Sequence, residues 1–233
     1  MGRGTLKRGR IVSRDSVLLY RVILSRRVVT DVSASVRRPG CTAVGIGSGH
    51  AESVDADKCP AGGVFVAADV HYLESGAAQA AAVVAADVAF AHLVADCVEL
   101  VREVEPYQPG QFWMRELPAL RVVLAGLTEL ALLVVDGYAD LDPDGRPGLG
   151  AYAHAEFAVP VIGVAKSAFR TATHAIAVQR GSSARPLFVT AAGMPRAEAA
   201  GLVQRMAGRY RLPDALRRAD TLARHGLPRA TRP

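Results

Sequence analysis

The stretch VFVAADVHYLESGAAQAAAVVAADVAFAHLVADCVELVREV (residues 64–104) decides how this chain folds. It holds three short apolar runs, at 64–72, 77–90 and 92–104, and a turn at 74–76 separates the first two. Short apolar runs bounded by turn residues are typical of strands, and short connections favour antiparallel pairing. We therefore predict three consecutive antiparallel strands, although the alanine-rich middle run would suit a helix equally well by propensity.

After this stretch, the sequence alternates between helical patterns and apolar runs. The run LALLVVDG (130–137) is apolar until its final carboxylate and glycine, which is typical of a central parallel strand. An α/β fold with a mixed sheet follows from this order. The predicted helices are 113–127, 148–157, 195–210 and 213–225, and the further predicted strands are 159–166, 174–180 and 185–191.

Length and composition limit the class of protein. The chain has 233 residues, of which 50% are hydrophobic and 21% charged, which predicts one larger domain with extra segments and excludes wholesale disorder. Every apolar run is shorter than the roughly 20 residues of a spanning helix, so we expect no membrane segment. Cys41, Cys59 and Cys97 form no CxxC pair, so no disulfide framework or four-ligand zinc site can be inferred, and a reducing cytoplasm fits best.

The net charge of +6 is unevenly distributed. Residues 1–40 hold 10 Lys and Arg against 2 Asp and Glu, residues 41–204 hold 10 against 18, and residues 205–233 hold 8 against 2. Basic ends on an acidic body fit binding of a polyanion, and solvated tails are the alternative. We predict that residues 1–60 are a flexible basic extension, or translated sequence upstream of the natural start, and that 226–233 is a basic tail.

Three acids lie where strands and helices begin or end. Asp69 and Asp136 follow apolar runs, and Glu116 lies in the first turns of a predicted helix. Buried runs that end in Asp are costly unless the acid meets a cation or hydrogen-bond donors. The three carboxylates could converge on a divalent ion such as Mg²⁺, and for each acid alone a turn or helix cap is the alternative.

Six segments together resemble one known family. In chain order they are VAADVHY, PYQPGQFWMRELPAL, LLVVDGY, VPVIGVAKS, RPLFVTAAG and YRLPDALRRAD, and they resemble the endonuclease V family, the deoxyinosine-directed nucleases. The resemblance covers about residues 64–222 and implies an RNase H-like fold: a mixed central sheet, its first three strands antiparallel, with helices on both faces. It also implies that residues 61–225 form the catalytic domain.

The resemblance assigns roles to single residues. It implies that Asp69, Glu116 and Asp136 bind the metal and that Asp220 is a further active-site carboxylate. Lys166 matches the family's active-site lysine, which could stabilise the attacked phosphate. The implied cofactor is Mg²⁺, with Mn²⁺ as a substitute, because phosphodiester hydrolysis needs charge neutralisation and an activated water.

The resemblance also implies a substrate-binding set. The turn PYQPG can project Tyr107 as a wedge beside the lesion, where an aromatic ring partly replaces lost base stacking. Pro109 makes this turn rigid, and Gly110 and Gly137 allow a purine edge to approach backbone groups. The alternative for Tyr107 is an ordinary turn anchor, and for the glycines simple turn geometry.

The chain also departs from the family pattern. Many relatives continue VDG with His-Gly and a later His-Pro-Arg, whereas this chain has Tyr138 and Asp142-Pro143, and Ser167 follows Lys166. The predicted function is a monomeric, Mg²⁺-dependent DNA repair endonuclease that hydrolyses the second phosphodiester bond 3′ to deoxyinosine, leaving 3′-hydroxyl and 5′-phosphate ends. The alternatives are an inosine-specific ribonuclease and a catalytically weak nucleic-acid-binding protein.

Overall fold

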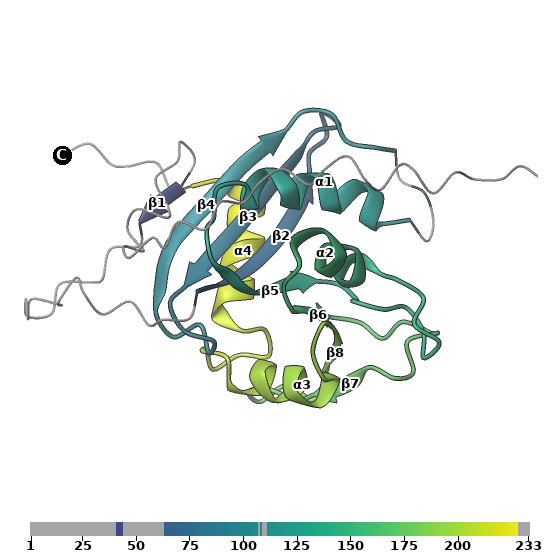
Figure 1. Ribbon diagram of the computed structural model, residues 1–233. Helices are drawn as coiled ribbons and strands as arrows, with labels where there is room; N and C mark the ends of the chain where they lie inside the picture. Colours follow the sequence, from purple (N-terminus) through teal and green to yellow (C-terminus); the bar gives the residue numbers. More distant parts are fainter. Residues whose placement is uncertain (1–40, 44–62, 107, 109–110, 228–233) are drawn as a thin grey trace, which may run out of the picture.

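A single mixed sheet forms the centre of the structure. The computed structural model describes residues 41–43, 63–106, 108 and 111–227, and for 41–43 it describes the backbone alone. Eight strands in this part of the chain form one sheet in the order β1-β4-β3-β2-β5-β6-β8-β7 (Figure 1). The strands are β1 (Cys41–Ala43), β2 (Val64–Tyr72), β3 (Ala78–Ala85), β4 (Leu93–Val101), β5 (Leu130–Asp136), β6 (Val161–Ala165), β7 (Ile176–Val178) and β8 (Leu187–Ala192).

The pairing confirms the predicted mixed sheet. Strands β2, β3 and β4 pair antiparallel in sequence, whereas β5 lies parallel to β2 and β6 parallel to β5. Strand β8 then pairs antiparallel with both β6 and β7. The alanine-rich run is strand β3, not a helix, because both of its neighbours are strands and helices cover it on both sides.

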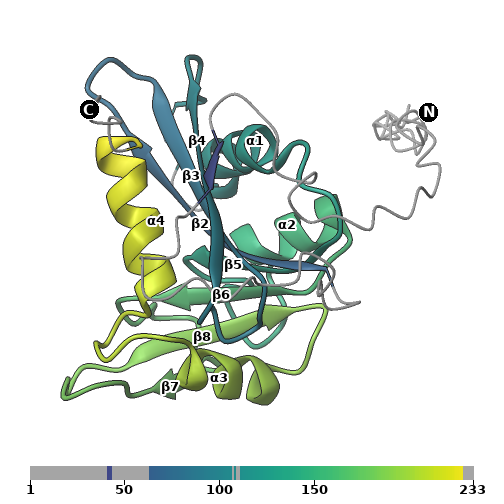
Figure 2. The same cartoon turned by 90° about the vertical axis from the view of Figure 1, so that its left-hand side faces the viewer.

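Helices cover both faces of this sheet, as predicted. Helices α1 (Trp113–Leu124) and α2 (Leu149–Phe157) lie on one face, and α3 (Arg196–Arg205) and α4 (Asp214–His225) on the other (Figure 2). Side chains alternate between the faces along each strand. On β2, Val66 and Ala68 belong to the core under α1, and Ala67 belongs to the core under α4. This alternation decides which polar residues can meet at the strand ends.

Helix α3 is shorter than predicted. The sequence pattern predicted a helix to Tyr210, but α3 ends at Arg205. Gly208 has a positive φ of 107°, which interrupts a right-handed helix. The buried guanidinium of Arg180 donates hydrogen bonds to the carbonyl oxygens of Met206, Gly208 and Tyr210. The segment after α3 is therefore a loop that is held by one arginine.

Few residues of the predicted extension and tail lie in the described part of the chain. Most of the predicted extension 1–60 lies outside the described residues, but Cys41–Ala43 pairs antiparallel with β4 at the sheet edge, a strand that the sequence did not predict. Cys41 is the register partner of Cys97, and Cys97 is disulfide-bonded, which the cysteine spacing did not reveal. Of the tail 226–233, residues 228–233 lie outside the described part. None of the described helices is long and apolar enough to cross a membrane.

Candidate active site

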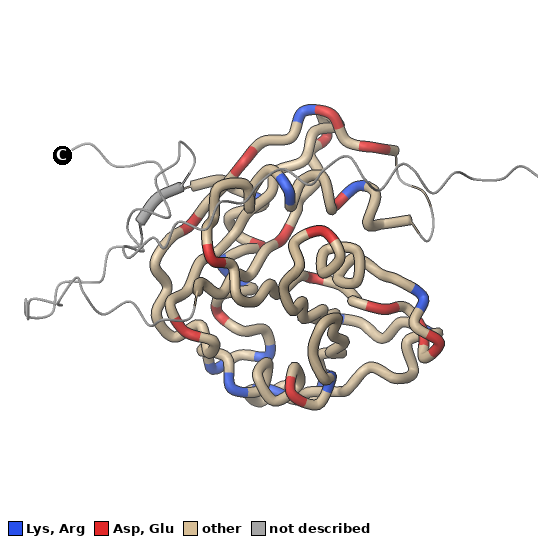
Figure 3. Tube along the Cα trace, viewed as in Figure 1, with Lys and Arg blue, Asp and Glu red and all other residues tan. Residues whose placement is uncertain are grey.

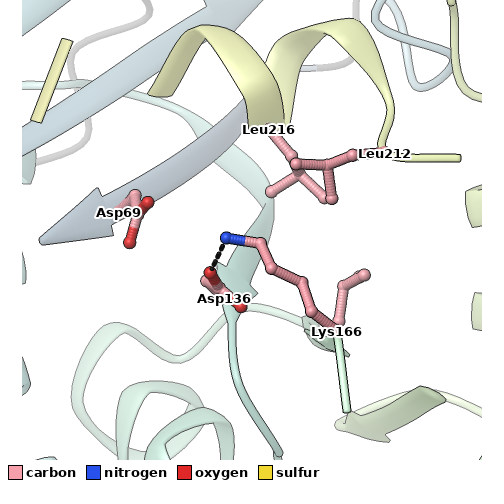
Figure 4. A pocket seen from close by; sticks show the side chains of 6 residues that line it. Asp69, Asp136, Lys166, Leu212 and Leu216 are labelled. Carbon is pink, nitrogen blue, oxygen red and sulfur yellow. Dashed lines mark ion pairs between the residues drawn. The ribbon is translucent and has the colours of Figure 1, made fainter. Parts of the chain in front are cut away.

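Strand register brings two predicted acids and the predicted lysine together. Ala68 of β2 is the register partner of Val135 of β5, so the following residues, Asp69 and Asp136, emerge side by side. On β6, Val164 is the partner of Asp136, and Lys166 lies two residues further, on the same face. The Lys166 ammonium nitrogen lies 2.6 Å from Oδ2 of Asp136 (Figure 4). All three side chains are on the α4 side of the sheet.

Helix α4 adds a third acid from above this face. Leu216 faces Asp69, Asp136 and Lys166 (Figure 4), and Asp220 follows one helical turn later on the same side of α4. Oδ1 of Asp220 lies 3.6 Å from the Lys166 nitrogen. The carboxylate of Asp220 also accepts two hydrogen bonds of 3.1 Å from Arg224. The C-terminal helix thus supplies a carboxylate and a cation to the site.

Glu116 reaches the site from the opposite face of the sheet. It lies in the first turn of α1 and is only 4% exposed. The Tyr72 hydroxyl donates a hydrogen bond of 3.1 Å to Oε1 of Glu116. The guanidinium of Arg115 lies 3.8 Å from the centre of the Tyr72 ring. Tyr72 and Arg115 therefore hold Glu116 at the end of β2.

One cavity of about 380 Å³ contains most of the predicted site residues. Gly137 lies at its edge with a φ of 133°, and a side chain there would meet open space. Tyr107, Pro109 and Gly110 lie outside the described residues, so their positions stay predictions. The cavity is lined by Asp69, Val70, His71, Tyr72, Phe112, Glu116, Asp136, Gly137, Lys166, Asp220 and Arg224.

The cavity disfavours negative charge on two of its acids. Burial, followed by the charge of Asp136, raises the pKa of Asp69 to about 7. Burial, followed by the charge of Asp69, raises the pKa of Glu116 to about 8. Mutual repulsion between close carboxylates adds to the cost of burying each one. Hence a cation inside this cavity would be stabilised by both residues.

The cations of the cavity compensate a different pair of acids. The hydrogen bonds from Arg224 are the main reason that the pKa of Asp220 lies below its usual value. Burial lowers the pKa of Lys166, but the hydrogen bond and charge of Asp136 outweigh it, so the net shift is upward. Lys166 therefore stays an ammonium between Asp136 and Asp220. The charge of Lys166 lowers the pKa of Asp69, and that of Arg115 lowers the pKa of Glu116, but neither outweighs burial.

The donor set of the cavity fits a hard divalent cation. Carboxylate oxygens are the ligands that Mg²⁺ and Mn²⁺ prefer, and Asp69, Glu116 and Asp136 line the same space. A divalent ion there would restore the ionised form of Asp69 and Glu116. Within the described residues, no three acids, histidines or cysteines already converge as a ligand set. The Lys166 ammonium, 2.6 Å from Oδ2 of Asp136, lines the same cavity.

The segment that departs from the family pattern is well anchored. Tyr138 donates a hydrogen bond of 2.8 Å to the Ser167 carbonyl and accepts one of 2.9 Å from the Phe169 amide. The buried Thr190 hydroxyl accepts a hydrogen bond of 2.7 Å from the Ala139 amide. The turn that follows is closed by a bridge between Asp140 and Pro147. Tyr138 thus links the end of β5 to the loop after Lys166.

Sequence reasoning missed two residues that shape the cavity. Arg224 follows Asp220 by four positions on α4, a spacing that places both on one helix face and could have identified it. Tyr72 follows Asp69 by three residues on a strand, so it faces the other side of the sheet. No sequence pattern indicated that α1 would bring Glu116 to its hydroxyl.

The sequence and fold of this chain are similar to those of known proteins. The endonuclease V family model matches residues 50–221. A Streptomyces avermitilis protein named endonuclease V is 31% identical over 196 residues, covering 74% of this chain and 84% of the relative. The crystal structure of endonuclease V from that organism has a TM-score of 0.59 at 29% identity, covering 71% of this chain and 81% of that one.

A more distant structure has the same fold. Endonuclease V from Ciona intestinalis, solved with a DNA containing an inosine followed by a ribo-adenosine, matches with a TM-score of 0.57. It is 20% identical, and the match covers 69% of this chain and 83% of that one. The similarity to endonuclease V structures confirms the RNase H-like fold that the sequence predicted.

Proposed function

Because this chain belongs to the endonuclease V family, we propose that it is a Mg²⁺-dependent DNA repair endonuclease that recognises deoxyinosine. It hydrolyses the second phosphodiester bond 3′ to the lesion and leaves a 3′-hydroxyl and a 5′-phosphate. The observation that carries this proposal is the cavity at the ends of β2 and β5, in which Asp69, Glu116 and Asp136 lie beside Lys166.

The residues of the cavity have two roles, cation binding and phosphate binding. Asp69, Glu116 and Asp136 hold the cation, with Mn²⁺ as a substitute for Mg²⁺. A bound divalent cation supplies charge neutralisation on the attacked phosphate and lowers the pKa of a bound water. Lys166 then binds a phosphate oxygen, since its ammonium is held at the cavity by Asp136 and Asp220.

Recognition of the lesion falls to a second set of residues. Tyr107 enters the duplex as a wedge, and Pro109 fixes its turn. Gly110 and Gly137 let the flipped base approach backbone groups; at Gly137 a side chain would have space but an unfavourable φ. The partner is DNA that contains deoxyinosine, and the enzyme acts as a monomer in the cytoplasm.

Inosine-directed cleavage of RNA is the second candidate. The Ciona intestinalis complex supports it, because the nucleotide after its inosine carries a ribose. A 2′-hydroxyl is the group by which a protein distinguishes RNA from DNA at a given position. One difference between the two candidates is therefore whether the 2′-hydroxyl of the nucleotide after the lesion is accepted.

Single-turnover nicking tests both candidates in one experiment. Inosine-containing DNA duplexes, single-stranded DNA, single-stranded RNA and inosine-free controls are incubated with excess enzyme, with Mg²⁺ or with EDTA. The proposal predicts Mg²⁺-dependent nicks in the deoxyinosine substrates, at the second bond 3′ to the lesion. Faster cleavage of RNA favours the second candidate. Binding without nicking in any substrate would show a nucleic-acid-binding protein and refute both.

A further inference from the structure

An exposed aromatic ring contacts two arginines on the α4 side of the molecule. Tyr210 is 44% exposed. The guanidinium carbons of Arg209 and Arg217 lie 4.9 Å and 4.6 Å from the centre of its ring. The Arg209 guanidinium also donates a hydrogen bond of 2.7 Å to the Tyr210 hydroxyl. We call Arg209, Tyr210 and Arg217 the arginine–tyrosine surface.

This surface belongs to a basic segment that follows an acidic one. Residues 64–204 hold 9 Lys and Arg against 15 Asp and Glu, whereas residues 205–225 hold 6 against 2. Figure 3 shows the basic residues gathering beside α3 and the start of α4. Asp214 lies 3.4 Å from Arg217, but its side chain is 48% exposed, and exposed pairs of this kind attract weakly. The surface therefore keeps a net positive charge.

Hydrogen bonds from two arginine side chains hold the loop between α3 and α4, which carries Arg209 and Tyr210. Arg180 is 5% exposed and donates hydrogen bonds to the Gly208 carbonyl at 3.0 Å and the Tyr210 carbonyl at 3.1 Å. Arg211 of the same loop donates one of 2.8 Å to the Pro186 carbonyl. Hydrogen bonds of this kind fix the backbone of Arg209 and Tyr210 before any partner arrives, which lowers the entropy cost of binding.

One face of α4 carries both Arg217 of this surface and Arg224 of the candidate active site. Arg224 lines the cavity, and Arg217 lies seven residues before it, which is two turns or about 10 Å along the helix. Thr221 is exposed between them. A groove of about 690 Å³ runs beside this face and is lined by Leu93, Asp214, Arg217, Arg218 and Thr221.

We propose that the arginine–tyrosine surface binds the phosphate backbone of the substrate strand beyond the cleaved bond. Guanidinium groups contact phosphates wherever a protein follows a nucleic-acid backbone, and exposed aromatic rings beside them stack on sugars or bases. In a duplex, about 10 Å corresponds to about three phosphates of one strand. A strand that enters the cavity can thus reach Arg217. This inference rests on the proposed function, because it takes the occupant to be the substrate of the cavity.

Salt dependence of binding tests the surface. We compare Arg217→Gln and Arg209→Gln with the wild-type protein, and use Arg121→Gln as the matched control, because Arg121 is an exposed arginine on α1, at the opposite face. Each lost phosphate contact should reduce the slope of log Kd against log salt by about 0.9 for duplex and 0.7 for single strands. At 0.1 M salt, this corresponds to about 5- to 8-fold weaker binding of a 30-nucleotide inosine substrate.

A short substrate separates this role from a structural one. With an inosine oligonucleotide trimmed to two nucleotides on either side, the strand does not reach the surface, so the variants should bind like the wild type. Tyr210→Phe, which keeps the ring, should bind more tightly than Tyr210→Leu. Unchanged slopes for both arginine variants would overturn the proposal and leave the surface for another acidic partner. Equal losses on long and short substrates would also overturn it.

Nicking by the wild-type protein is measured in parallel with Mg²⁺. If the wild type nicks no inosine substrate, the proposed function fails, while the salt slopes still decide whether the surface binds a nucleic-acid strand. If the wild type nicks and the slopes are unchanged, only the surface proposal fails.

Discussion

Removing the charge of Asp69 should stabilise the metal-free protein while it abolishes cleavage. The cavity raises the pKa of Asp69 from 3.8 to about 7. Asn has nearly the same shape, and its amide oxygen can still accept the hydrogen bond of 2.8 Å from the Val70 amide. Asp69→Asn therefore removes the cost of a buried charge and little else.

The direction of the pH dependence follows from this raised pKa. The folded wild type keeps a proton on Asp69 up to about pH 7, whereas the unfolded chain releases it near 3.8. The resulting stabilisation is complete below the lower value and is lost as the pH rises through the higher one. The wild type should thus lose stability between pH 5 and pH 8.5 in EDTA, and Asp69→Asn should lose less.

The stabilisation expected from Asp69→Asn has an upper bound. A shift of about 3 pKa units corresponds to about 4 kcal/mol, and solvent screening at a half-buried carboxylate reduces this to about 2 kcal/mol. For a chain of this size, about 2 kcal/mol raises Tm by about 4–8 °C. At pH 8.5 in EDTA, the variant should melt higher than the wild type by that amount, and the advantage should shrink at pH 5.

Circular dichroism melts at both pH values measure this difference. Asp144→Asn is the matched control, because Asp144 is exposed on the turn after β5. Excess Mg²⁺ should reverse the order at pH 8.5, since ligand at 100 times its Kd adds about 2.7 kcal/mol to a protein that binds it. A variant that melts below the wild type at pH 8.5 in EDTA would refute the reasoning.

Three further predictions concern the site, the wedge and helix α4. Asp136→Asn should fold normally but nick at least about 100-fold more slowly, and retained nicking with normal Mg²⁺ dependence would remove Asp136 from the metal site. Tyr107→Ala should lower duplex specificity for inosine by about 10- to 100-fold and affect single-stranded substrates less, as measured by relative nicking rates. Arg218→Leu should lower the free energy of unfolding by about 3 kcal/mol in urea titrations, because it leaves the 3% exposed Asp96 without its bidentate partner.

Much of the fold was predictable because local patterns agreed with each other. The apolar run 130–137 is typical of a central strand and forms β5, and the short connections around β3 overrode its helical propensity. The end of α3 was not predictable. It depends on Arg180, which lies 26 residues before Met206 in the sequence and contacts it only in the folded state. Likewise, the pairing of Cys41–Ala43 with β4 depends on a partner strand some 50 residues away.

The position of two of the site's acids was predictable because it follows from strand pairing. Asp69 and Asp136 terminate neighbouring parallel strands, and alternation of side chains places both on one face, so their encounter follows from the register. Glu116 reaches the same cavity from the other face, which no periodicity indicates. The family resemblance predicted that Glu116 belongs to the site, and its hydrogen bond with Tyr72 shows how it is held there.

Helix α4 couples the site, the core and the proposed backbone contact, so its register matters to all three. Leu216 and Leu222 bury its inner side, while Asp220 points into the cavity and Arg217 outwards. A rotation of α4 by one residue, about 100°, would withdraw Asp220 and expose leucine. The pair of Arg218 with the buried Asp96 on β4 resists that rotation. Arg218→Leu should therefore slow nicking as well as destabilise the fold, and normal single-turnover rates in a fully folded variant would show that core packing alone sets the register.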